Sequence, residues 1–354
     1  MLRYVVEQRG SDLHIKVGAV PHVRVDGHLT PGPFPVVSPA DTERIAAEVL
    51  PALRAEEFEK TGESDFAHSV AGLGRFRVNV FRQRGSVGIV LRRVLPGMPS
   101  FESLGLPSVV RRLAEESRGL VLVTGPTGSG KTTTIAAMID HINETRSANV
   151  VTIEDPIEVL HSDKKSIINQ REIGSDTLGY SEALRRVLRQ DPDVIFIGEM
   201  RDTETVWAAL SAAETGHLVL STLHTTNATE TVNRIVDFFP PFQQKQIRLT
   251  LASSLKGLVC QRLLERADGK GRVPAVEVMV MTGRVYDRLL DSEDQETIEQ
   301  VIAEGEYYGM QTFDQSLFNL FKNGLVTLRD ALTAASHPHD FRIALQQEGL
   351  MPAN

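Results

Sequence analysis

The chain has 354 residues, of which 41% are hydrophobic and 24% are charged, a composition that is typical of globular proteins and excludes disorder as the main state. This length predicts two or three domains. The formal net charge of −8 excludes the basic field that surrounds many nucleic-acid-binding proteins, so any phosphate chemistry must be local.

Residues 1–95 are predicted to form a mixed α/β domain with antiparallel strands. In SDLHIKVGAVPHVRVDGHL, residues 11–29, apolar side chains alternate with polar ones, which is the period of a strand. Residues 41–60 instead have the apolar spacing of a helix, with Asp41 as the expected N-cap. The stretch FRVNVFRQRGSVGIVLRRV predicts a hairpin that turns near Gly85.

A second domain is predicted beyond a Pro- and Gly-rich linker at 96–108. From 109 to 270, helix patterns alternate with strands that are apolar almost throughout, such as GLVLVT, VIFI and HLVLSTL. This α/β alternation predicts a parallel sheet with helices on both faces, in which ligands bind beyond the carboxyl ends of the strands. Residues 271–354 are predicted to be a helical carboxyl-terminal region.

One loop carries the pattern of a phosphate-binding P-loop. GPTGSGKT, residues 125–132, matches GxxxxGK[ST] after a predicted strand and before a predicted helix, the context that the motif requires. Glycines let backbone N–H groups turn toward an anion, while the helix amino terminus and the lysine add positive charge. A glycine-rich turn without a ligand is the alternative. We expect ATP to contact Gly125, Pro126, Thr127, Gly128, Ser129, Gly130, Lys131, Thr132 and Thr133.

Polar side chains follow three other predicted strands. Glu199 ends DVIFIGE, Glu154 ends NVVTIE and His224 ends HLVLSTLH. At the carboxyl ends of parallel strands, a carboxylate can hold Mg²⁺ or a water molecule, and a histidine can contact a phosphate. Carboxylates that cap the next helix and a histidine without a role are the alternatives for each residue alone. Together with the P-loop, the three residues favour ATP hydrolysis.

At these motifs the chain resembles the secretion ATPase superfamily of hexameric motors, and within it the type IV pilus retraction ATPases (PilT/PilU, twitching motility). The matching stretches are GPTGSGKTTT, TIEDPIE, RQDPDVIFIGEMRDTET and AAETGHLVLSTLHT. SDLHIKVGAVPHVRVDGHL and GMQTFDQSLFNL extend the resemblance to nearly the whole chain. It implies a PAS-like first domain, a RecA-like ATPase domain with a helical tail, and a homohexamer.

The resemblance also implies roles for individual residues. Lys131 would hold phosphates, and Thr132 and Glu199 would hold Mg²⁺, with Glu199 also holding the attacking water. Glu154 would be a second catalytic carboxylate, and which glutamate is the general base stays open. His217 and His224 would link the γ-phosphate to movement.

The hairpin holds Arg75, Arg77, Arg82, Arg84, Arg92 and Arg93 with no acid among residues 75–93. Strand alternation places Arg77 opposite the core face and Arg92 opposite the apolar face of the return strand. A solvated basic face or a nucleic-acid patch would explain these arginines. We favour contact with a phosphate across a subunit boundary, because Arg77 and Arg92 match the spacing of arginines that resemble arginine fingers in related ATPases.

The function that the sequence favours is therefore ATP-driven pilus retraction. The single cysteine, Cys260, cannot form the four-cysteine zinc insert usual in pilus-assembly and type II secretion ATPases. An accessory PilU-like role or a pilus-assembly or secretion ATPase is the alternative; a scaffold with weak turnover and a nucleic-acid translocase are more remote.

The expected partners are copies of the same chain, an inner-membrane pilus platform protein and, indirectly, pilin, with no nucleic acid. No apolar run approaches the roughly 18–20 residues of a membrane span, and MLRYVVEQRG lacks an apolar signal segment. We therefore expect a cytoplasmic protein, peripheral at the inner face of the cytoplasmic membrane.

Overall fold

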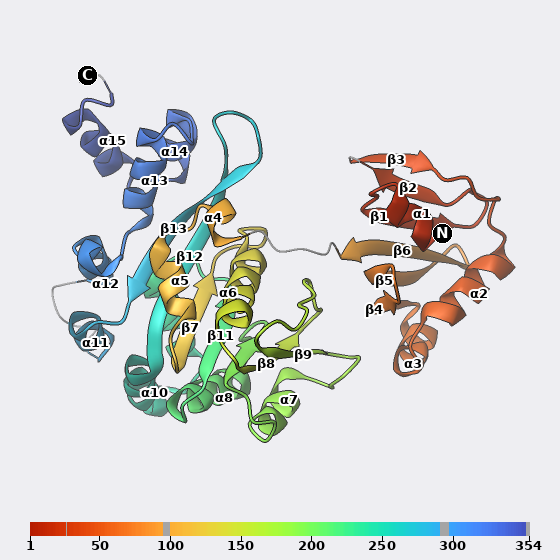
Figure 1. Ribbon diagram of the computed structural model, residues 1–354, viewed down its shortest axis with the longest axis horizontal. Coiled ribbons are helices and arrows are strands. Elements are labelled where there is room, and N and C mark those ends of the chain that lie inside the picture. Colours follow the sequence, from red (N-terminus) through yellow and green to blue (C-terminus); the bar gives the residue numbers. More distant parts are fainter. Residues whose placement is uncertain (26, 95–99, 291–296, 352–354) are drawn as a thin grey trace. The chain divides into compact units, whose positions relative to one another are not determined.

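The computed structural model describes residues 1–25, 27–94, 100–290 and 297–351 (Figure 1). The chain divides into two compact units. The first comprises residues 1–97, 154–160 and 170–179, and the second comprises the rest. No helix among the described residues combines the length and the apolar character needed to cross a membrane.

The first unit contains a six-stranded sheet in the order β3-β2-β1-β6-β5-β4. Its neighbouring strands are all antiparallel. Alternate side chains such as Phe76, Val78 and Val80 are buried against the helices on one face. The elements are α1 (Leu2–Glu7), β1 (Asp12–Lys16), β2 (His22–Val25), β3 (His28–Pro31), α2 (Pro39–Val49), α3 (Ala52–Thr61), β4 (Glu63–Val70), β5 (Gly74–Gln83) and β6 (Ser86–Val94).

The predicted hairpin is β5 and β6, and its turn lies at Arg84 and Gly85, whose φ angles are +49° and +76°. The single helix predicted over 41–60 is wrong, because the chain forms α2 and α3 with a break at Pro51. Proline cannot continue a helix, since it lacks the N–H donor and its ring clashes with the preceding turn. Asp41 is also not the N-cap. Ser38 is, and Asp41 completes a capping box three residues later.

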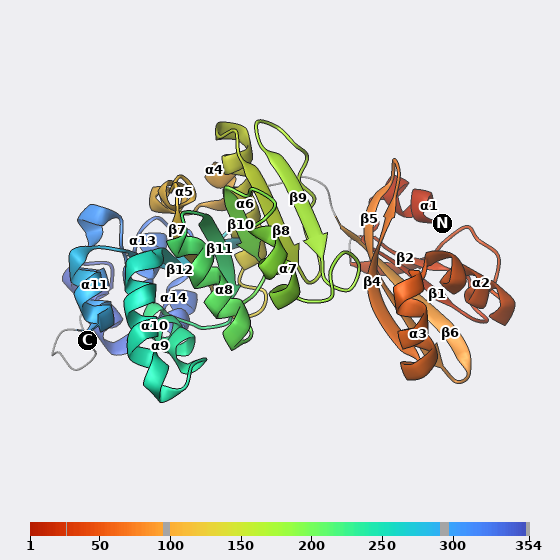
Figure 2. The ribbon, with the colours of Figure 1, turned by 90° about the horizontal axis from the view of Figure 1, so that it is seen from below.

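The second unit is built on a seven-stranded sheet in the order β13-β12-β7-β11-β10-β8-β9. Strands β12, β7, β11, β10 and β8 are parallel, and β13 is antiparallel to β12. Figure 2 shows α5 and α6 on one side of this sheet and α8 and α10 on the other. The described sheet is thus the predicted parallel sheet with helices on both faces.

The first half of this unit carries the motifs. Its elements are α4 (Phe101–Leu104), α5 (Ser108–Ala114), β7 (Gly119–Thr124), α6 (Lys131–Thr145), β8 (Asn149–Glu154), β9 (Ile167–Glu172), α7 (Tyr180–Val187), β10 (Val194–Ile197), α8 (Thr203–Glu214) and β11 (Leu218–Leu223). Strand β9, at the edge of the sheet, was not singled out by the sequence analysis. The linker predicted at 96–108 contains α4, and its residues 96–99 lie outside the described residues.

The second half extends the sheet and then becomes helical. Its elements are α9 (Ala228–Asp237), α10 (Pro241–Ser254), β12 (Leu255–Glu265), β13 (Arg272–Val280), α11 (Gly283–Leu290), α12 (Ile298–Ala303), η1 (Glu306–Tyr308), α13 (Phe313–Lys322), α14 (Leu328–Ala334) and α15 (Pro338–Gln347). The prediction of a wholly helical region over 271–354 is wrong for β13. Pro274 argues against a central strand, but β13 is the outer strand of the sheet, where a proline is tolerated.

Candidate nucleotide-binding and catalytic site

The predicted P-loop connects β7 to α6. Strand β7 is buried along its whole length, and α6 begins at Lys131 directly after Gly130. Gly125, Gly128 and Gly130 have φ angles of +145°, +80° and +91°, which side chains with a Cβ rarely adopt. The glycines therefore allow the tight turn between a buried strand and the start of a helix, as the motif requires.

Lys131 is buried and points back into this loop. Its Nζ donates to the main-chain oxygen of Gly125 at 2.7 Å and to that of Pro126 at 3.0 Å. The ammonium group is thus held at the centre of the loop rather than in solvent. A phosphate entering the loop would meet a positioned cation at the amino terminus of a 15-residue helix.

Strand β12 packs so closely against the loop that two of its positions have no room for a Cβ atom. A Cβ on Gly125 would lie 2.3 Å from the main-chain oxygen of Gln261, and one on Gly130 would lie 2.8 Å from Nε2 of the same residue. The buried Gln261, on β12, also accepts a hydrogen bond at 2.8 Å from the hydroxyl of Thr134 in α6. Gln261 therefore fixes the position of the loop and of the first turn of α6. Sequence reasoning missed this residue because it follows no motif.

The loop also contains a buried polar atom that lacks a partner. Among the described residues, nothing hydrogen-bonds to the hydroxyl of Ser129, although the side chain is buried. Buried polar groups are usually hydrogen-bonded, and an exception at a loop of this shape indicates a ligand atom. The loop, Lys131 and this hydroxyl together fit a nucleotide phosphate.

Glu199 and His224 meet at the edge of the sheet where β10 and β11 end. Nε2 of His224 lies 3.1 Å from Oε1 of Glu199. The hydrogen bond between Met200 N and Thr222 O also holds these two strand ends together. The side chain of Glu199 is only 18% exposed. Two of the residues predicted to follow strands, a carboxylate and a histidine, thus contact each other at this edge.

Arg201 is a third member of this group that the sequence analysis did not single out. Its Nε donates to Oε2 of Glu199 at 2.8 Å, so each carboxylate oxygen of Glu199 has a protein partner. An arginine and a histidine on the two oxygens orient the carboxylate. The next residue, Asp202, is the N-cap of α8, and this cap fixes the backbone next to Arg201.

Glu154 is the last residue of β8 and belongs to the first unit. Its Oε1 accepts a hydrogen bond at 3.1 Å from Nε2 of Gln170, and its side chain is buried. The same unit contains Glu172, whose Oε2 accepts hydrogen bonds from Arg75 at 2.5 Å and from Ile157 N at 2.9 Å. The acidic motif is thus held by a hydrogen-bonded framework that includes one of the hairpin arginines.

His217 does not join His224. The two histidines lie at opposite ends of β11, which runs from Leu218 to Leu223, so about 20 Å separates their backbones at the usual rise per strand residue. Nδ1 of His217 lies 3.0 Å from the main-chain oxygen of Ala212, at the end of α8. Within one chain, a role for His217 must therefore act at the other edge of the sheet.

The predicted arginine pair is adjacent in the structure, because Arg77 on β5 lies directly across from Arg92 on β6. Arg77 is exposed, as its strand position predicts. Arg92 is 71% exposed and donates through Nε to Oδ1 of Asp12 at 2.8 Å. Two other hairpin arginines also pair with acids of this chain, Arg82 with Glu43 and Arg75 with Glu172. Acidic residues of the same chain therefore neutralise part of the positive charge of the hairpin.

A buried carboxyl group lies behind the site. Glu277, on β13, is 5% exposed, and its Oε1 accepts a hydrogen bond at 2.7 Å from Ala228 N, the first residue of α9. The pKa of Glu277 is raised to about 7, mainly by burial and also by the charges of Glu299 and Asp314, whereas the hydrogen bond from Ala228 and the charge of Arg262 lower it. Helix α9 begins four residues after His224 in the chain. Nothing in the sequence marked Glu277.

Comparison with known proteins assigns the chain to a family. The model for the type II/IV secretion system proteins matches residues 2–317. The chain belongs to this family. It is 42% identical over 341 residues to the type IV pilus retraction ATPase PilT of Pseudomonas aeruginosa, covering 96% of this chain and 98% of that one. It is 41% identical over 346 residues to the type IV pilus ATPase PilU of the same organism, covering 98% and 90%.

A solved structure supports the same assignment. The crystal structure of the pilus retraction motor PilT with bound ADP aligns with a TM-score of 0.87 and 47% identity, over 96% of this chain and 97% of that chain. The predicted resemblance to the PilT/PilU group and the predicted fold are confirmed. The chain is an ATPase of this family.

Proposed function

We propose that this chain is a motor that hydrolyses ATP to drive type IV pilus retraction. The observation that carries the proposal is a nucleotide-binding loop in the same unit as an oriented carboxylate, Glu199, which both His224 and Arg201 contact. This geometry suits hydrolysis rather than simple nucleotide binding. The 42% identity with the retraction ATPase PilT supports a type IV pilus as the structure on which this motor acts.

Each residue has a distinct part in the proposed reaction. Lys131 exchanges its bonds to two loop carbonyls for bonds to phosphate oxygens, which are stronger because both partners are charged. The hydroxyl of Thr132 and the carboxylate of Glu199 are the residues that would hold Mg²⁺, which supplies positive charge beside the phosphates. Glu199 also orients the attacking water. His224 contacts Glu199, so a change at the γ-phosphate moves His224 and with it the end of β11 and the loop before α9.

The general base is either Glu199 or Glu154. Both carboxylates are mostly buried and hydrogen-bonded, so burial alone does not separate them. Single-turnover hydrolysis by the Glu199→Gln and Glu154→Gln variants separates them. Loss of the base slows the chemical step by about 10²–10⁴-fold, and loss of a positioning group slows it less.

We propose that the chain works as a homohexamer in which Arg77 and Arg92 contact the nucleotide of a neighbouring copy. Arg77 is the stronger candidate, because it is exposed while Arg92 is already bound to Asp12. An arginine in trans stabilises charge on the transferred phosphoryl group and makes hydrolysis depend on ring closure. Mixing Arg77→Ala with Lys131→Ala subunits tests this. Mixed rings should regain activity, and no recovery despite verified mixing contradicts the trans role.

The proposed setting is the cytoplasmic side of the inner membrane, where the ring acts on a pilus platform protein and through it on pilin. Deletion of the gene tests the function directly. A retraction motor predicts excess surface pili and no twitching, whereas cells without pili would indicate an assembly motor. ATPase rates that do not change on addition of DNA are expected, and strong stimulation by DNA would favour a translocase.

An accessory role like that of PilU is the second candidate, because identity with PilU is 41%, almost the same as with PilT. The principal and accessory roles predict different effects on pilus retraction when the gene is deleted from a cell that keeps its other motors. Loss of all retraction supports the principal motor. Retraction that persists but weakens under load supports the accessory role.

A further inference from the structure

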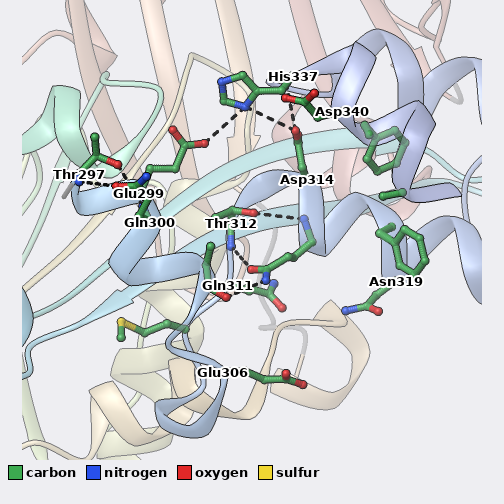
Figure 3. Close-up of a pocket in the computed structure, with 16 residues that line it drawn as sticks. Thr297, Glu299, Gln300, Glu306, Gln311, Thr312, Asp314, Asn319, His337 and Asp340 are labelled. Carbon is green, nitrogen blue, oxygen red and sulfur yellow. Dashed lines mark hydrogen bonds and ion pairs between the residues drawn. The ribbon is translucent and has the colours of Figure 1, made fainter. Parts of the chain in front are cut away.

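The carboxyl-terminal helices enclose a groove that the proposed catalysis does not use. Its cavity has a volume of about 760 Å³ and is lined from α12, η1, α13 and α15 together with the segment before α13. Figure 3 shows these side chains converging on one space. The volume exceeds that of a single side chain and lies in the range of ligand sites.

The inner surface of the groove has an apolar part between its polar residues. Met310 and Phe341 are each 3% exposed, and Phe318 is half-buried beside them. Ala303 and Ala344 complete this surface, and because their side chains are small they leave space between the helices. A ligand with an apolar face could therefore bury it here.

The rim of the groove is acidic. Among the residues that line it are Glu299, Glu306, Asp314 and Asp340, and none is a lysine or an arginine. Two of these acids already have partners within this chain. Asp314 accepts hydrogen bonds from Ser336 N at 2.7 Å and His337 N at 3.0 Å, and Glu299 Oε1 lies 3.5 Å from the His337 imidazole.

Glu306 and Asp340 differ from this pair. Across the described part of the chain, neither makes an ion pair with a lysine or an arginine, and both are exposed. Figure 3 places Glu306 apart from Asp340, with the groove between them. Tyr307, the neighbour of Glu306, is 90% exposed, and exposed aromatic rings attract arginine and lysine through cation–π contacts.

We propose that this groove binds a cationic amphipathic segment of a partner protein. Apolar side chains of the segment contact Phe318 and Phe341, and its arginine or lysine side chains pair with Glu306 and Asp340. Charge complementarity excludes a nucleotide or another phosphate, and among the described residues no group of three histidine, cysteine, aspartate or glutamate side chains could hold a metal ion. A segment of two or more turns would fill the groove.

The test uses the full chain and a synthetic peptide in which leucine and arginine repeat with helical period. Binding is measured by fluorescence anisotropy without nucleotide, so it is independent of the proposed ATPase cycle. The variant that combines Glu306→Gln with Asp340→Asn should bind about tenfold more weakly, since two partly exposed ion pairs are lost. A control variant with Glu214→Gln and Asp237→Asn loses two exposed acids outside the groove and should bind like the original chain.

A third variant tests the groove itself without changing charge. Ala344→Phe fills the space between α13 and α15 and should also weaken binding about tenfold, while ATPase activity shows that the chain remains folded. A leucine–glutamate peptide of the same pattern should not bind. Equal binding by the original chain and the Glu306/Asp340 variant would overturn the proposal. So would a change in oligomeric state in that variant, which would assign the groove to a second copy of this chain.

Discussion

The buried carboxyl group of Glu277 provides a quantitative test of the structure. The pKa of this group rises from 4.5 to about 7, with burial as the largest cause. Because the folded chain then binds a proton that the unfolded chain has already lost, stability should fall as pH rises from about 4.5 to 7 and then level off. At 1.36 kcal/mol per pKa unit, the total loss is about 3 kcal/mol.

Replacing Glu277 with glutamine should remove this pH dependence. The amide oxygen can still accept the hydrogen bond that Ala228 N donates to Oε1 at 2.7 Å, so the start of α9 keeps its partner. The amide carries no charge at any pH in this range. The free energy of unfolding of the original chain, relative to that of the Glu277→Gln variant, should therefore fall by about 3 kcal/mol between pH 4.5 and 7.5.

The assay is urea unfolding of the chain without nucleotide, followed by far-ultraviolet circular dichroism across that pH range. Glu265→Gln, the same change at the exposed end of β12, controls for the loss of one negative charge. A difference between the original chain and Glu277→Gln that stays constant with pH would refute the reasoning. It would mean that the carboxyl group is hydrated or paired in solution and pays no cost of burial.

Three further outcomes follow from the nucleotide site. Lys131→Ala should lower ATP turnover by at least about 10²-fold, measured by phosphate release, and an unchanged rate would exclude this lysine from the site. Glu199→Gln should retain binding of a fluorescent ATP analogue while turnover falls by about 10²–10⁴-fold; turnover at the original rate would make the assignment of this strand end wrong. Gly125→Ala should lower the free energy of unfolding by about 1–3 kcal/mol, because its φ is +145° and its Cβ would lie 2.3 Å from Gln261 O; thermal unfolding at the original temperature would contradict that contact.

The sequence predicted the parts of the site that follow local rules. A glycine pattern between a buried strand and a helix determines the P-loop almost alone, because few other sequences allow those φ angles. The carboxyl ends of β10 and β11 could be predicted as neighbours, and with them Glu199 and His224, since parallel strands end at one edge. The turn of the hairpin at Gly85 followed from its residue types in the same way.

The parts that the sequence missed depend on contacts between distant segments. Gln261 lies 127 residues from its partner Thr134, and Glu277 lies 49 residues from Ala228. No local pattern marks such pairs, because their roles arise only when β12 and β13 join the sheet. The family resemblance grouped His217 with His224, but the length of β11 separates them. The domain boundaries and the roles of individual site residues stay predictions.

We expect an electrostatic link between the groove and the start of α9 through Glu277. The charges of Glu299 and Asp314, two acids on the rim of the groove, raise the pKa of Glu277. Glu277 in turn holds the first residue of α9, which follows the loop that begins at His224. A cationic segment in the groove should offset those two charges and so lower the pKa of Glu277.

This linkage predicts that binding of the leucine–arginine peptide releases protons near neutral pH. If the pKa of Glu277 falls by about half a unit, affinity should rise about threefold between pH 6 and 8, because the peptide binds the ionised form better. Histidine also titrates in this range, so the chains with and without Glu277→Gln should both carry His337→Gln, which removes the histidine that lines the groove. The rise should disappear when Glu277→Gln is added. A rise that persists in that double variant would place the titrating group elsewhere and would remove the electrostatic link between the groove and α9.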